Sequence, residues 1–122
     1  MLFRSSPATM ASYSNYAGSN TAISDRFVVA YGNMPWNAGS VAINGSNMGV
    51  SQGTSFAAPL VAGYAAIVSQ KFSNLTAANT SNIILDTARY DTLSCNPSCD
   101  PTIYGKGEAS LSRALAPVGR LR

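Results

Sequence analysis

Residues 53–63 read GTSFAAPLVAG and place a serine at the start of a long apolar stretch. We expect a helix from Ser55 to about Lys71, in which small or apolar side chains occupy almost every position. A helix without a polar face is a buried helix. At the start of such a helix several N–H groups lack partners within the helix, and the helix dipole is positive. An oxygen beside Ser55 that gains negative charge would therefore be stabilised.

The local sequence around Ser55 leaves two interpretations open. The simpler one is a Thr-Ser cap on a core helix, because both residue types are common helix caps. The other is an activated nucleophile. Pro59 stands four residues after Ser55, so its ring opposes the Ser55 carbonyl, and we expect the backbone there to depart from regular helix. We also expect Gly53 to let another backbone approach closely. A phosphate-binding loop is excluded, because no lysine stands directly before Thr54.

The segment before Ser55 predicts strands. Residues 27–30, FVVA, form a continuous apolar run that suits a strand buried on both faces of a parallel sheet. Residues 41–45, VAING, contain an Asn-Gly pair, which predicts a β-hairpin with a return strand at about 48–51. The sequence thus predicts a parallel strand, a hairpin and a buried helix, in that order.

The two ends of the chain carry weaker signals. Residues 1–20 are rich in Ser, Ala, Asn and Gly and are predicted to be loop. A second helix is predicted from Thr76 to Ala88, with Asn74 or Thr76 as its cap and with Ala77, Ile84, Leu85 and Ala88 on one face. Three short elements are expected near the C-terminus: an extended piece at 103–104, a turn at 105–107 and a helix at about 110–115.

Composition excludes several classes of protein. At 122 residues the chain is one domain or part of one. Its hydrophobic content of 46% and charged content of 11% suit a piece of a larger buried interior rather than a disordered chain. The net charge of +3 comes from scattered basic residues, so nucleic-acid binding is not supported. No apolar stretch is long enough to span a membrane, and no signal-peptide core follows Met1.

Two cysteines and three asparagines suggest covalent modification. Cys95 and Cys99 make only half a zinc site in a chain without histidine, so a short disulfide is favoured. It would imply an oxidising compartment and give only a small stabilisation. Asparagine begins an Asn-x-Ser/Thr glycosylation triplet at positions 44, 74 and 79, although such triplets also occur by chance.

Residues 53–59 followed by 61–63, GTSFAAP and VAG, resemble the serine motif of subtilisin-like serine proteases, the subtilases of peptidase family S8. Three further blocks resemble this family in the expected order: ASYSNYAG at 11–18, VAYG at 29–32 and YGKG at 104–107. The resemblance covers about residues 11–115 of a partial catalytic domain, with 116–122 as a tail or linker. It implies an α/β fold, the C-terminal portion of a doubly wound parallel-sheet domain. Residues 114–119 resemble the junction that follows the protease domain in autotransporter-type subtilases.

The resemblance also implies a mechanism. Ser55 would be the nucleophile and a backbone oxyanion donor, and Thr54 would help to shape the oxyanion hole. In subtilases the triad runs Asp, His, Ser, so the acid and the base would lie upstream of Ser55. The sequence contains no histidine, and we expect the chain alone to be an inactive fragment of an endopeptidase.

The expected partners are a polypeptide substrate and the missing N-terminal part of the catalytic domain, without cofactor, metal, nucleic acid or membrane span. The parent protein would be secreted or displayed at the cell surface. The alternative function is a non-catalytic binding or structural module, or a pseudogene product, that retains the subtilase core.

Overall fold

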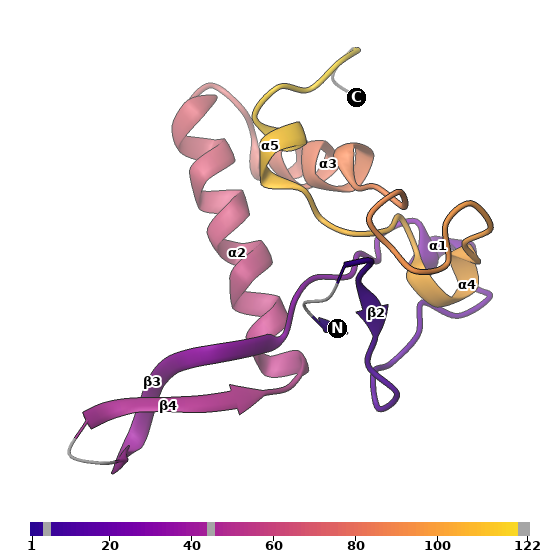
Figure 1. The fold of residues 1–122 in the computed structure, drawn as a ribbon. Helices are drawn as coiled ribbons and strands as arrows, with labels where there is room; N and C mark the ends of the chain where they lie inside the picture. Colours follow the sequence, from indigo (N-terminus) through magenta and orange to yellow (C-terminus); the bar gives the residue numbers. More distant parts are fainter. Residues whose placement is uncertain (4–5, 44–45, 120–122) are drawn as a thin grey trace.

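The computed structural model describes residues 1–3, 6–43 and 46–119. In chain order the elements are β1 (Leu2–Phe3), β2 (Thr9–Met10), α1 (Thr21–Ser24), β3 (Asn33–Ile43), β4 (Ser46–Gln52), α2 (Thr54–Lys71), α3 (Ala77–Thr87), α4 (Pro101–Tyr104) and α5 (Leu111–Ala114). Figure 1 shows the long helix α2 with the β3–β4 hairpin at its N-terminal end and with α3 and α5 beside its C-terminal half. This mixture of helices and short strands is compatible with an α/β fold.

The apolar run 27–30 leads into a buried part of the fold. On one side, Leu2 N–H donates to the Ala30 carbonyl at 2.7 Å, and Gly32 N–H donates to the Leu2 carbonyl at 3.1 Å. On the other side, Val29 pairs in parallel with Glu108. Val29 and Ala30 are buried, whereas residues 27 and 28 are half-buried. The predicted parallel environment is therefore confirmed at isolated bridges, and a continuous strand over 27–30 is not formed.

The prediction of loop for residues 1–20 is wrong at two places. β1 and β2 pair antiparallel, with Leu2 opposite Met10. The two strands are only two residues long, and Leu2 also pairs with Tyr31. Local sequence gave no signal for them because two residues are too few to show the alternating pattern of a strand.

The hairpin expected before Ser55 is confirmed. β3 and β4 pair antiparallel, from Asn33 opposite Gln52 to Ile43 opposite Ser46. β3 begins well before the predicted start at residue 41, and its pairing shifts register twice. The predicted Asn-Gly turn at 44–45 lies outside the described residues.

Helix α2 spans the predicted range, but the structure does not bury it. Only Val68 is fully buried in this helix. The exposed positions recur every three to four residues along one face: Thr54, Ser55, Ala58, Pro59, Ala62, Gly63, Ala66 and Ile67. The prediction of a buried helix is therefore wrong for this chain, because the described residues cover only one side of α2 and its C-terminal end.

The C-terminal half of α2 packs into a small helical core. Val68, Ile83 and Ala114 are its buried members, contributed by α2, α3 and α5. Thr76 caps α3, as predicted, by accepting a hydrogen bond from Asn79 N–H at 3.1 Å. The predicted face of α3 is only partly correct, since Ala77 is exposed. The short helix expected at 110–115 is confirmed as α5, which Ser110 caps.

The extended piece predicted at 103–104 is instead the end of the one-turn helix α4. Asp100 caps this helix by accepting a hydrogen bond from Thr102 N–H at 2.8 Å, and Pro101 provides the first residue. Both features favour helix initiation and were available in the sequence. The turn predicted at 105–107 is confirmed, with positive φ values at Gly105 and Gly107.

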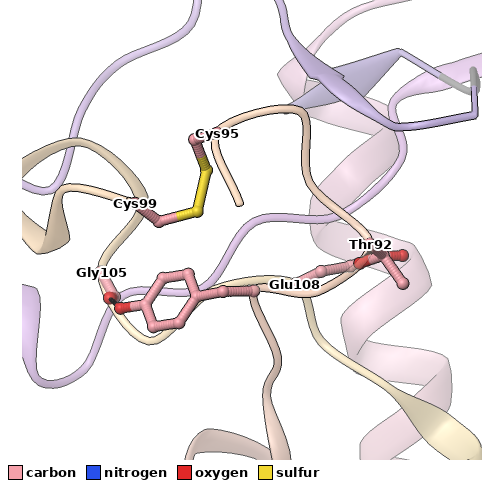
Figure 2. The surroundings of a disulfide bond; sticks show 6 residues. Thr92, Cys95, Cys99, Gly105 and Glu108 are labelled. Carbon is pink, nitrogen blue, oxygen red and sulfur yellow. Dashed lines mark hydrogen bonds between the residues drawn. A yellow bond between two sulfur atoms is a disulfide. The ribbon is translucent and has the colours of Figure 1, made fainter. Parts of the chain in front are cut away.

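A second core lies beside the cysteine loop 95–99. Leu2, Ala8, Val29 and Leu93 form its buried centre, and Cys95 and Cys99 pack against it. These two cysteines form a disulfide, which confirms the favoured pairing (Figure 2).

Hydrogen bonds tie residues 89–94, the segment that precedes the disulfide, to the rest of the fold. The Tyr90 hydroxyl donates to the Gly105 carbonyl, and the Thr92 hydroxyl donates to the Glu108 carboxylate. Partial burial raises the pKa of the Tyr90 hydroxyl above its ordinary value. The Ala8 N–H also donates to the Thr92 carbonyl at 2.9 Å. The segment thus joins Ala8, directly before β2, to residues 105–108.

Reduction of the disulfide should destabilise this core moderately. Closing a loop this short is worth about 2 kcal/mol in the chain-entropy model, so we expect a lower urea midpoint for the 122-residue chain in the presence of a thiol reductant. The Cys95→Ser/Cys99→Ser double variant should show the same lowered midpoint with or without reductant. An oxidised wild type with the midpoint of the double variant would contradict a stabilising role.

Candidate functional site

The candidate site lies where β4 passes into α2. β4 ends at Gln52, Gly53 is the N-cap residue in extended conformation, and α2 begins at Thr54. Thr54 and Ser55, the two residues predicted to carry the site, therefore stand side by side on the first turn of an 18-residue helix. Both residues are exposed, so the serine is accessible from solvent in this chain.

The helix-cap interpretation of Thr54 and Ser55 is wrong. Both residues lie inside α2, the N-cap position belongs to Gly53, and no side chain makes a capping hydrogen bond. The helix also continues through Pro59, so the proline does not end it. Ser55 therefore does not cap the N-terminal end of α2.

Some of the first N–H groups of α2 donate to backbone carbonyls and others do not. Phe56 N–H donates to the Gly53 carbonyl at 3.0 Å, but Ser55 N–H donates to no backbone carbonyl of the described residues. An unpaired N–H at a helix start, where the dipole is positive, can bind an anionic oxygen. The arrangement places this donor on the residue that also carries the hydroxyl.

Gly32 holds the backbone of the junction in place. Gly53 N–H donates to the Gly32 carbonyl at 3.0 Å, so the end of the segment 29–32 is attached to the residue before Thr54. A Cβ atom at Gly32 would lie 2.5 Å from the Gly53 carbonyl oxygen. At Gly53 itself, a Cβ would meet only ordinary contacts at 3.9 Å. The close approach expected at Gly53 therefore depends on Gly32, which the sequence analysis did not single out as a site residue.

Other kinds of functional site receive no support in the described part of the chain. No group of three or more His, Cys, Asp and Glu side chains is arranged to hold a metal among those residues. Within the same ranges, no helix is both long and apolar enough to cross a bilayer.

Comparison with known protein families identifies the family to which the chain is related. The sequence model of the Subtilase family matches residues 4–112, which is most of the chain. The chain belongs to the subtilase family. This subtilase chain has no match among curated proteins or among solved structures. The family is one of serine peptidases, whose substrates are polypeptides, and the resemblance inferred from residues 53–63 is confirmed.

A long span around the serine motif of this subtilase chain lacks charge. No charged residue occurs between Arg26 and Lys71, a span that contains the parallel run, the hairpin and most of α2. Solvated surfaces of globular domains are normally rich in charge. The uncharged span includes the exposed face of α2, formed by Ala58, Pro59, Ala62, Gly63, Ala66 and Ile67.

Replacing Gly32 with alanine should loosen the junction. The new methyl group would meet a backbone oxygen that cannot rotate away, so the bond between Gly53 N–H and the Gly32 carbonyl should break. Loss of about 1 kcal/mol for one hydrogen bond corresponds to roughly fivefold faster amide exchange at Gly53. Gly63→Ala is the control, since a Cβ there meets nothing within 4 Å. Unchanged exchange at Gly53 in Gly32→Ala would contradict the role of Gly32.

Proposed function

We propose that this subtilase chain supplies the nucleophile of a serine endopeptidase. In this mechanism Ser55 Oγ attacks the carbonyl carbon of a peptide bond and forms an acyl-enzyme. The Ser55 N–H donates to the oxyanion of the tetrahedral intermediate, and Thr54 helps to shape the oxyanion hole. The observation that carries the proposal is the exposed Ser55 on the first turn of α2, with a backbone N–H that no described carbonyl accepts.

The general base of this reaction must come from outside these 122 residues. Subtilases use a histidine as base, and this sequence contains none. In subtilisin, loss of the histidine alone lowers kcat by about 2 × 10⁶, so the chain by itself should have no useful peptidase activity. The acid, the base and a side-chain oxyanion donor would be contributed by the N-terminal part of a subtilase catalytic domain, in the same or another polypeptide.

The exposed face of α2 supports such a partner. Small side chains such as Ala58, Ala62 and Ala66 allow close packing by another element, and the face carries no charge that would need solvent. The partner would extend the parallel pairing around Val29 into a doubly wound sheet and would cover α2. This packing would make α2 the buried helix that its apolar sequence indicates.

We further propose that the parent protein is secreted or displayed at the cell surface. The disulfide between Cys95 and Cys99 supports this placement, because disulfides persist in oxidising compartments. The similarity of residues 114–119 to the junction of autotransporter-type subtilases also favours export.

The alternative is a non-catalytic binding or structural module that retains the subtilase core. The absence of histidine favours it, since a chain that never meets a base would keep Ser55 only as an inherited residue.

Peptide hydrolysis distinguishes the two functions. The 122-residue chain would be co-expressed with an N-terminal subtilase segment that carries the Asp and His blocks, and cleavage of a chromogenic peptide would be measured for each chain and for the pair. The proposed function predicts activity only for the pair. The non-catalytic module predicts no activity in any combination, even when the two segments co-purify.

A further inference from the structure

The Met1 side chain packs against the junction between β4 and α2. A Cβ atom built on Gly32 would lie 2.5 Å from Met1 Cγ, 2.8 Å from Met1 Sδ and 2.5 Å from the Gly53 carbonyl oxygen. The thioether and the Gly53 carbonyl therefore lie on the same side of Gly32 and close to each other. Met1 is only 4% exposed, so this side chain fills space inside the fold.

Hydrogen bonds hold the backbone from which this side chain projects. The Met1 nitrogen donates to Ser14 Oγ at 2.8 Å, and the Met1 carbonyl accepts from Ala11 N–H at 3.1 Å. The next carbonyl, that of Leu2, accepts from Gly32 N–H at 3.1 Å. Because the backbone is bonded on both sides of the Met1 Cα, the thioether is held beside Gly32.

The Gly53 carbonyl links this contact to the proposed nucleophile. It accepts a hydrogen bond from Phe56 N–H at 3.0 Å, and this bond lies across the start of α2. Ser55 stands inside that turn, one residue before the donor. A shift of the Gly53 carbonyl would therefore move the backbone that carries Ser55 Oγ and Ser55 N–H.

We propose that Met1 is a positioning residue for Ser55. Its side chain limits the movement of the Gly53 carbonyl in the space beside Gly32, which has no side chain of its own to fill it. A thioether suits this role, because methionine adapts its shape to irregular gaps. Met1 acts through Gly53 and takes no part in bond making. The effect on catalysis rests on the proposed function, whereas the effect on the junction does not.

The first test measures the junction without enzymatic activity. Each variant would be produced as a ubiquitin fusion whose removal leaves the 122-residue chain, so that any side chain can stand at position 1. Met1→Ala should raise amide exchange at Gly53 and Phe56 about fivefold, the factor for the loss of one hydrogen bond. Met1→Leu should leave exchange close to the wild-type rate, because swaps that conserve volume are tolerated best.

Exchange at Phe72 is the internal reference. Its N–H donates to the Val68 carbonyl at 2.9 Å, and both residues belong to the separate helical core. A local effect of Met1→Ala on the junction leaves this amide unchanged, whereas general unfolding would raise its exchange as well.

The second test measures catalysis in the pair formed with the N-terminal subtilase segment. Met1→Ala should lower kcat by about 10- to 100-fold, since a displacement of about 1 Å can cost a hundredfold in rate. KM should change little, because Met1 is buried and acts on Ser55 rather than on the peptide. Rates are expressed per site that a fluorophosphonate labels at completion, which corrects for any loss of folded protein. Met1→Leu should restore the wild-type rate.

Three results would overturn the proposal. One is unchanged exchange at Gly53 in Met1→Ala, and another is a parallel rise at Gly53 and Phe72. The third is an unchanged kcat per labelled site in Met1→Ala when the wild-type pair is active. If the wild-type pair is inactive, the proposed function fails, and the exchange measurement alone decides whether Met1 positions the junction.

Discussion

Replacing Ser55 with alanine in the assembled pair should lower kcat for peptide hydrolysis by about 10⁶, the size of the loss measured for the serine of subtilisin. The alanine variant cannot form an acyl-enzyme, and only binding and the oxyanion donors remain. Peptide binding should change little, because Ser55 Oγ makes its bond only during the reaction. The measurement is steady-state hydrolysis by the wild-type and variant pairs at equal concentration.

Ser73→Ala is the matched control for Ser55→Ala. Ser73 is an exposed serine beyond the other end of α2, so the same change there should leave kcat unaltered. If Ser55→Ala retained more than a small fraction of the activity, another residue would be the nucleophile and the proposed assignment of the site would be wrong.

Replacing Gly105 with alanine should remove much of the stability of the chain. Gly105 has φ of 58° and ψ of −122°, a conformation that costs a residue with a side chain about 1–3 kcal/mol. A Cβ there would also overlap the Phe27 carbonyl oxygen and lie 2.9 Å from the Phe27 carbonyl carbon. Forcing that backbone apart adds about 1–3 kcal/mol. The sum is comparable with half of a typical domain stability. Urea denaturation followed by circular dichroism measures this loss.

Gly18→Ala separates the two contributions to the Gly105 effect. Gly18 also has a positive φ, 83°, but a Cβ there would meet nothing within 4 Å. Its replacement should cost only about 1–2 kcal/mol, the expense of a left-handed conformation. Equal urea midpoints for Gly105→Ala and Gly18→Ala would show that the contact with Phe27 is not tight.

The sequence predicted those elements whose signals are local. The helix after Gly53, the second helix with Thr76 as its cap, the hairpin and the glycine turn at 105–107 all occur in the structure. Their signals are short-range ones, such as apolar spacing, capping side chains and residues that favour turns. For the same reason α4 was predictable from Asp100 and Pro101, and the extended piece predicted in its place ignored that capping signal.

Burial and long-range pairing could not be predicted in the same way. The all-apolar pattern of α2 indicates that the helix needs cover, but it does not say which residues provide that cover. In this chain Val68 is the one residue of α2 that is fully buried. Likewise, the role of Gly32 depends on Gly53, which is distant in sequence and is joined to it by one backbone hydrogen bond.

The candidate site was predictable as far as its residues belong to this chain. The serine motif located Thr54 and Ser55 from a compact signal, and the structure places both on the first turn of α2. The local sequence alone favoured a helix cap, because a serine near the start of a helix is found both in caps and at nucleophile positions, and caps are common. The identity of the base lies beyond any inference from these residues, since the sequence holds no histidine.

Covalent labelling with a fluorophosphonate probe tests most directly whether Ser55 is a nucleophile that needs a base from elsewhere. The chain would be treated alone and together with the N-terminal subtilase segment, and the labelled peptide would be located by mass spectrometry. The account predicts no adduct on the chain alone and an adduct on Ser55 in the assembled pair. A well-assembled pair in which Ser55 stays unlabelled, or a chain that is labelled at Ser55 without a partner, would contradict it.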